Sequence, residues 1–187
     1  MPDHDGLLAL LAERSARRGN FTLASGRQSS LYIDARLTTM SPEGLATIGP
    51  LALSTLRAMN WNIDAVGGLT LGADPVSYAI AYASASTDAP LRAFTIRKEP
   101  KTYGMMRLIE GPFQTGDRVA VIEDVITTGG SALRAIEAVR AAGGIVVGLL
   151  AVVDREEGGR EALLAIGIPV VSLATASALI ARLSHQS

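Results

Sequence analysis

Apolar residues follow two patterns along the chain: short continuous runs, and longer stretches in which they recur every three to four positions. The runs predict buried strands over 65–69, 91–97, 118–123, 145–153 and 170–174. The helical spacing predicts helices over 5–18, 42–59, 75–84, 131–142 and 160–166, and 21–25 and 31–36 are expected to be extended. Apolar strands alternating with helices indicate an α/β protein whose parallel sheet is covered on both faces.

The amino-acid composition disfavours several classes of protein and several kinds of catalytic site. A length of 187 residues suits one domain, and a formal net charge of −1 disfavours a general nucleic-acid binder. The chain has no Cys, and its only histidines, His4 and His185, lie next to the ends, which disfavours thiol chemistry, Ser-His-Asp triads and multi-His metal sites. The first residues have no leader-like pattern, and no apolar run reaches a membrane-spanning length. We therefore expect a cytoplasmic enzyme or regulator.

Segment 119–131 carries the most informative chemistry. Its apolar strand ends in adjacent carboxylates, Glu123 and Asp124, and hydroxyls and glycines follow at the expected helix start. Gly129 and Gly130 permit positive φ and close backbone approach, so free helix N–H groups and hydroxyls can cradle a phosphate. The carboxylates would repel that phosphate directly, so we expect them to accept hydrogen bonds from neutral hydroxyls or to reach a metal. A ribose 5-phosphate fits this description; a plain capped turn beside a solvated acidic pair is the alternative.

This segment resembles, over its whole length, the phosphoribosyl pyrophosphate (PRPP) motif of the type I phosphoribosyltransferases. Segments 21–27, 31–34, 67–75, 97–104, 107–111 and 153–155 are similar, within that family, to the orotate phosphoribosyltransferases. The resemblance implies the type I phosphoribosyltransferase fold, an α/β fold with a central, mostly parallel sheet flanked by helices and a small N-terminal hood. We expect a single domain over 1–187, with the hood formed mainly by about 1–40 and the core by about 41–187.

The resemblance also implies residues that bind PRPP. Glu123 and Asp124 would hold the ribose hydroxyls, and the 5-phosphate would be cradled by Val125, Ile126, Thr127, Thr128, Gly129, Gly130 and Ser131. A long connection after the strand 91–97 would be a catalytic loop that closes over the pyrophosphate, which would be bound by Arg97, Lys98, Lys101 and Tyr103. The expected catalytic residues are Lys101, Asp124, Arg97 and Lys98. A solvated surface loop is the simpler alternative for this connection.

Orotate would, by the same resemblance, lie against Tyr32 and Ile33 and be contacted by Thr127 and Arg155, because a guanidinium binds a planar carboxylate at two points. The implied reaction, a step of pyrimidine (UMP) biosynthesis, transfers ribose 5-phosphate from PRPP to N1 of orotate and yields orotidine 5'-phosphate and pyrophosphate. Mg²⁺ would be held mainly by the substrates, with no dedicated protein site. The resemblance further implies a homodimer with shared active sites, and neither nucleic acid nor membrane is an expected partner.

The sequence also allows alternative roles for some of these residues and alternative activities for the protein. Arg155 could instead pair with Asp154 or Glu156, and Tyr32 and Ile33 could be ordinary strand packing. The enzyme could use another base, or the chain could be a non-catalytic regulator that senses PRPP. Ala24 and Asp74 stand where some relatives have Lys, and Tyr103 where many have His, so the site is expected to be less basic than in those relatives.

Overall fold

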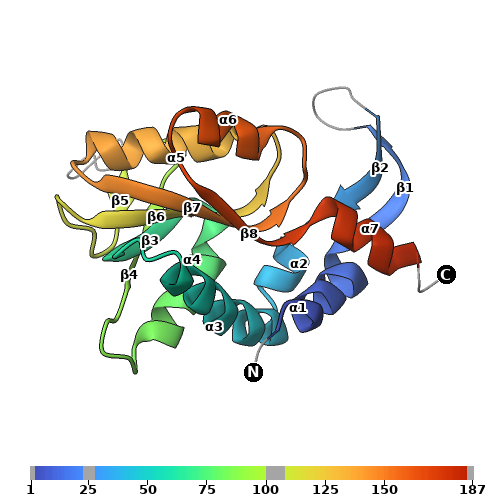
Figure 1. The fold of residues 1–187 in the computed structure, drawn as a ribbon, viewed down its shortest axis with the longest axis horizontal. Helices are drawn as coiled ribbons and strands as arrows, with labels where there is room; N and C mark the ends of the chain where they lie inside the picture. Colours follow the sequence, from blue (N-terminus) through green and yellow to red (C-terminus); the bar gives the residue numbers. More distant parts are fainter. Residues whose placement is uncertain (1–2, 23–27, 100–107, 185–187) are drawn as a thin grey trace.

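The computed structural model describes residues 3–22, 28–99 and 108–184. Its centre is a six-stranded sheet in the order β5-β4-β3-β6-β7-β8 (Figure 1). Every neighbouring pair is parallel except β4 with β5, which confirms the expected, mostly parallel α/β fold. The strands are β3 (Ala65–Leu69), β4 (Arg92–Ile96), β5 (Ile109–Glu110), β6 (Arg118–Ile126), β7 (Ile145–Asp154) and β8 (Val170–Thr175).

Helices cover both faces of this sheet. Helices α3 (Pro42–Ala58) and α4 (Ala73–Ser84) lie on one face, and α5 (Gly130–Ala141) and α6 (Gly159–Ala165) lie on the other (Figure 1). Strand β6 shows why both faces are apolar: Ala120 and Ile122 belong to the core cluster on the α3 and α4 side, whereas Val119 and Val121 belong to the cluster packed on α5. Successive strand side chains point to opposite faces, so a doubly covered strand is apolar throughout.

The N-terminal part corrects the prediction of one helix over 5–18. Helix α1 (His4–Leu10) continues as a single π-helical segment, η1 (Leu11–Ser15), and the chain then enters strand β1 (Ala16–Thr22). Strand β1 pairs antiparallel with β2 (Gln28–Ile33), and Arg17 and Arg18 lie opposite Tyr32 and Leu31. The two arginines are therefore strand residues, because pairing with a segment more than ten residues away outweighs their local helical pattern.

Three elements were not predicted from the sequence: α2 (Arg36–Thr39), β5 and α7 (Ala176–Ser184). Strand β5 lies within the long connection after β4, for which no regular structure was predicted, and its Ile109 pairs with Ile96. Helix α7 packs against α1, η1 and β1, so the end of the described chain returns to its beginning (Figure 1). None of the helices built from the described residues combines the length and apolar character needed to cross a bilayer.

Candidate active site

A cavity of about 410 Å³ opens at the carboxyl ends of β3, β6 and β7. Helix α4 follows β3 onto one face of the sheet and α5 follows β6 onto the other, so the loops after these neighbouring strands diverge. Such a point is where open α/β sheets bind ligands. This main cavity is lined by Tyr32, Ile33, Asp34, Ala35, Arg36, Leu69, Thr70, Leu71, Gly72, Lys98, Glu123, Asp124, Val125, Thr127, Ser131, Arg134 and Arg155.

Two further hollows adjoin the main cavity. The small hollow, of about 220 Å³, lies over the turn between β6 and α5 and is lined by Glu123, Val125, Ile126, Thr127, Thr128, Gly129, Gly130, Ser131, Ala132 and Arg134. The side trough, of about 550 Å³, is lined by Leu69, Ile96, Arg97, Lys98, Leu108, Arg134, Glu137, Ala138 and Ala141. The main cavity and the small hollow share the acidic residue Glu123 and the hydroxyls of Thr127 and Ser131, which makes them parts of one site.

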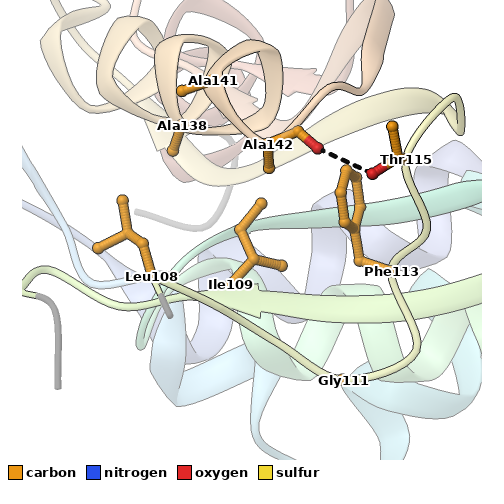
Figure 2. Close-up of a pocket in the computed structure, with 8 residues that line it drawn as sticks. All are labelled: Leu108, Ile109, Gly111, Phe113, Thr115, Ala138, Ala141 and Ala142. Carbon is orange, nitrogen blue, oxygen red and sulfur yellow. Dashed lines mark hydrogen bonds between the residues drawn. The ribbon is translucent and has the colours of Figure 1, made fainter. Parts of the chain in front are cut away.

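Another hollow, of about 470 Å³, lies between β5 and α5 (Figure 2). Apolar side chains such as Leu108, Ile109 and Phe113 face Ala138 of the helix, and Thr115 donates a hydrogen bond of 3.4 Å to the Ala142 carbonyl. No charged side chain lines this hollow among the described residues. The charged side chains of this end of the sheet line the main cavity and the two hollows beside it instead.

The acidic pair lies inside strand β6, which continues to Ile126 and does not end at Glu123 as predicted, because Val125 and Ile126 still pair with Val153 and Asp154 of β7. Glu123 is only 6% exposed, and its Oε1 accepts no hydrogen bond from any described residue. A buried carboxylate oxygen without a donor is costly unless a ligand supplies one.

Asp124 is held in place by its surroundings. Its Oδ1 accepts a hydrogen bond of 2.8 Å from the Val125 N–H. The loop after β3 passes so close that a Cβ added at Gly72 would lie 2.4 Å from the same oxygen. Glycine is therefore required at position 72 if this loop is to approach the carboxylate.

The pKa values of Glu123 and Asp124 are both higher than those of exposed carboxyl groups. Burial, reinforced by the neighbouring charge of Asp124, raises the pKa of Glu123 to about 8, and the Arg134 guanidinium opposes this shift. Burial also raises the pKa of Asp124, which the Val125 N–H and the charge of Arg36 partly offset. In the protein without ligand, both carboxyls gain from new hydrogen-bond donors, which a vicinal diol supplies.

Glu123 makes stability depend on pH. Because its pKa is about 8 in the folded chain and near 4.5 when exposed, the unfolded state loses this proton first as pH rises. We expect the free energy of unfolding to fall between pH 5 and pH 8, with a contribution from Glu123 of at most ~5 kcal/mol. Denaturant titrations of wild type and E123Q at both pH values measure it. The glutamine variant should lose less stability over this interval, and equal losses in the two proteins would contradict the assignment.

The turn between β6 and α5 has the geometry of an anion cradle. Gly129 caps α5 with a φ of 86°, which a side chain rarely tolerates, and leaves the first N–H groups of the helix free of intrahelical partners. The start of α6 supports the turn from behind: the Gly159 N–H donates 2.9 Å to the Thr127 carbonyl, and a Cβ at Gly159 would lie 2.5 Å from that oxygen. The cradle is thus fixed by tertiary packing as well as by its own sequence.

Arg155 extends from the loop after β7 towards strand β2. Its Nη2 donates 3.1 Å to both Ser29 Oγ and the Leu31 carbonyl, and its Nε donates 2.7 Å to Glu157 Oε1. The expected alternative pairing with Asp154 or Glu156 is wrong. Asp154 accepts from the Glu156 N–H, and the Glu156 carboxylate accepts from the backbone and the hydroxyl of Ser177.

Strand β2 supplies the opposite wall. Tyr32 and Ile33 line the main cavity together with Arg155, and the Tyr32 ring lies 5.5 Å from that of Phe21, centroid to centroid. Next along the chain, Asp34 accepts two hydrogen bonds from the Arg36 guanidinium, of 2.8 and 3.0 Å, which hold the pKa of Asp34 below its usual value. This wall therefore combines an aromatic face with a fixed ion pair.

Asp74 ties the loop after β3 to the sheet. Its carboxylate accepts hydrogen bonds of 2.7 Å from Thr70 and 2.8 Å from Thr95, whose hydroxyl also lies 2.7 Å from Tyr78 Oη. An acidic residue in the first turn of α4 is also favourable to the helix. The residue thus orders a loop of the site and supplies no cation to it.

The structure brings together most of the predicted site residues. The main cavity and the small hollow contain Tyr32, Ile33, Lys98, the acidic pair, 125–131 and Arg155. Arg97 lines only the side trough, where its Nη1 is 3.8 Å from Glu110 Oε1. Lys101 and Tyr103, like Ala24, lie outside the described residues. Sequence reasoning missed Arg36 and Arg134; a position three residues after Ser131 on a predicted helix was the available signal for Arg134.

Comparisons with known proteins agree with this picture. No protein-family model matches the chain. Orotate phosphoribosyltransferase of Aquifex aeolicus is 47% identical over 183 residues, covering 96% of this chain and 99% of that protein. Two crystal structures of Mycobacterium tuberculosis orotate phosphoribosyltransferase superimpose over 95% of this chain and 99% of theirs: a complex with Fe(III) dicitrate at 44% identity and TM-score 0.83, and a complex with PRPP at 42% and 0.79.

The sheet order, the acidic pair on β6 and the glycine-capped cradle define a phosphoribosyltransferase of type I. The extent and identity of the matches then decide between its branches. The chain belongs to the orotate phosphoribosyltransferase family.

Proposed function

We propose that this protein transfers ribose 5-phosphate from PRPP to N1 of orotate, giving orotidine 5'-phosphate and pyrophosphate, in pyrimidine biosynthesis. The observation that carries the proposal is that one cavity holds the acidic pair of β6, the guanidinium of Arg155 and the wall formed by Tyr32 and Ile33. A sugar diol, a carboxylate and a flat ring each find a matching group there.

Each part of PRPP has a place in this proposal. The ribose hydroxyls donate to Glu123 and Asp124, and the buried Oε1 of Glu123 gains a donor that no described residue supplies. The 5-phosphate occupies the small hollow, against the backbone and hydroxyls of 125–131. Lys98 lines both the main cavity and the side trough, so it can contact the pyrophosphate on the open side of the site. Arg97, Lys101 and Tyr103 remain proposed pyrophosphate ligands from the family resemblance.

Orotate is proposed to lie between strand β2 and the loop after β7. Arg155 lines the main cavity beside Tyr32 and Ile33, and its side chain, which also pairs with Glu157, is only 8% exposed, so a carboxylate that reaches its remaining N–H groups meets a largely desolvated cation. Thr127 lines the same cavity and can donate a hydrogen bond to the base.

Catalysis then follows from charge placement. As the bond between C1' and the pyrophosphate oxygen breaks, positive charge grows on the ribose and negative charge grows on the leaving group, while N1 of orotate forms the new bond on the opposite face and releases its proton to solvent or to the leaving pyrophosphate. Asp124 and Glu123 lie on the ribose side and Lys98 on the open side, so the fixed charges complement both changes. No strong general base is required, and the main work is to hold the two reactants in line.

Mg²⁺ fits this site as a cation carried by the substrate. Among the described residues no group of three potential metal-ligating side chains occurs, whereas the oxygens of Glu123 and Asp124 line the cavity where a substrate-held ion would sit. These two residues would hold it through the ribose hydroxyls. When bound, the ion supplies neutralisation of charge on the leaving pyrophosphate.

We further propose a cytoplasmic homodimer in which the catalytic loop of one subunit serves the site of the other. Support comes from large apolar and aromatic side chains that the loop after β3 and helix α4 leave exposed: Leu71 is 61% exposed, Tyr78 52% and Tyr82 86%. Neighbouring exposed apolar side chains of this size often mark a protein interface.

Loss of orotate absorbance in the near ultraviolet, with PRPP and Mg²⁺ present, tests the function. We expect turnover by the wild type and, in R155L, a KM for orotate raised by about 10- to 100-fold with a smaller change for PRPP, because a charge-assisted contact to the carboxylate is lost. R160L, which removes an exposed arginine of α6 away from the cavity, is the matched control. Consumption of a purine or uracil in place of orotate would overturn the base assignment, and PRPP binding without any turnover would indicate a regulator.

A further inference from the structure

Arg134 lies where the three connected hollows of the site meet. It is on the exposed face of α5, in the second turn, and lines the main cavity, the small hollow and the side trough. Among the described residues that line the small hollow it is the one cation, beside glycines, hydroxyls and Glu123. An anion seated in the cradle therefore has this guanidinium within its wall.

The guanidinium is also available for a ligand. Its Nη2 donates 3.1 Å to Ser131 Oγ, a neutral hydroxyl of the cradle. Arg36, Arg92 and Arg155 are each paired with a carboxylate, but within the described part of the chain Arg134 forms no ion pair. The donor atoms that do not contact Ser131 can therefore bind phosphate oxygens without first breaking a salt bridge.

The position favours the phosphate in the cradle over the pyrophosphate. Arg134 and Ser131 are three residues apart and hence lie on the same face of α5, and both line the small hollow with Gly129 and Gly130. Lys98 and Arg97 line the side trough, which Arg134 also reaches, but neither of them lines the small hollow. Two anions of one substrate can thus be held by two separate sets of cations.

We propose that Arg134 is a further substrate-binding residue, the side-chain cation that binds the 5-phosphate of PRPP beside the backbone cradle. The identity of PRPP as the full substrate rests on the proposed function. The contact between Arg134 and the phosphate can be tested with ribose 5-phosphate alone.

Calorimetric titration of wild type, R134Q and R134K with ribose 5-phosphate and, separately, with pyrophosphate tests the assignment. We expect R134Q to bind ribose 5-phosphate about 10- to 100-fold more weakly, R134K to recover part of the loss, and pyrophosphate affinity to be unchanged. In turnover assays the KM for PRPP should rise by a similar factor with a smaller change in kcat. R140Q, at the exposed end of the same helix, is the matched control and should resemble the wild type.

Several outcomes would overturn the proposal: ribose 5-phosphate binding that is equal in wild type and R134Q, a loss confined to pyrophosphate, or no binding of ribose 5-phosphate by the wild type. If R134Q does not fold, equal affinities of wild type and R134K would count against a role for the forked guanidinium. The proposed function can be rejected independently of the role of Arg134. An inactive wild type that still binds ribose 5-phosphate through Arg134 would reject orotate transfer and retain the phosphate contact.

Discussion

Replacing both carboxyls of β6, as in E123Q with D124N, is expected to lower kcat/KM for PRPP by about 10³-fold or more. Each residue is proposed to accept a hydrogen bond from a ribose hydroxyl, worth about 1.5–3 kcal/mol when the acceptor is charged. Binding of these donors favours the ionised carboxylates, whose negative charges face the sugar as it becomes cationic. The loss should appear in kcat as well as in KM, because part of the interaction grows only as the C1' bond breaks. Steady-state kinetics with PRPP as the varied substrate measure the effect.

The same variant should fold at least as well as the wild type at pH 8. Glu123 is buried with an oxygen that no described residue satisfies, so a neutral amide removes the cost of ionising it. E161Q, which changes an exposed carboxylate of α6, is the matched control for charge and should leave the kinetics unchanged. Unchanged kcat/KM in the double variant would remove the acidic pair from the ribose site.

Gly68→Ala is expected to destabilise the protein by about 3–5 kcal/mol and to lower its Tm by roughly 10 °C. Gly68 lies in β3, and a Cβ there would be 2.1 Å from the Ile122 carbonyl oxygen of the neighbouring strand and 2.7 Å from the Ala73 Cβ. Neither neighbour can move without shifting β6 or the start of α4. Denaturant and thermal unfolding, followed by circular dichroism, measure the change.

Gly130→Ala is the matched control for this substitution. A Cβ at Gly130 meets no atom within 4 Å, and the residue begins helix α5. Alanine there should be neutral or stabilise the fold by up to ~1 kcal/mol, because glycine costs helix stability. A Gly68→Ala protein as stable as the control would show that the sheet relaxes around β3 more easily than its packing indicates.

The β3 glycines connect stability with the site. The loop from Leu69 to Gly72 leaves the end of β3 and forms a wall of the main cavity against Asp124. A displacement of β3 therefore moves a substrate-binding wall as well as the core. The close approach of two strands and one loop is what allows a small domain to bring the acidic pair, the base wall and the phosphate cradle into one cavity.

The sequence by itself determined the alternation of strands and helices, because strands buried on both faces must be apolar throughout and the covering helices carry an apolar stripe. It also indicated the cradle, since the glycine that adopts a positive φ at position 129 and the hydroxyls beside it are local properties of segment 119–131, although packing against α6 helps to fix the turn. The predicted end of a strand was wrong where pairing with a neighbouring strand extends it. Strand β6 continues to Ile126 because its last residues still pair with β7.

Only the tertiary structure decided features that depend on partners distant in sequence. The local pattern at Arg17 and Arg18 favours a helix, but pairing with β2 makes them strand residues. Arg155 contacts Ser29 and Leu31, more than a hundred residues earlier in the chain, whereas the sequence offered only pairing with Asp154 or Glu156 as an alternative to its proposed orotate contact. The raised pKa of Glu123 likewise arises from burial among several elements, which no local pattern encodes, because desolvation depends on everything that packs around a group.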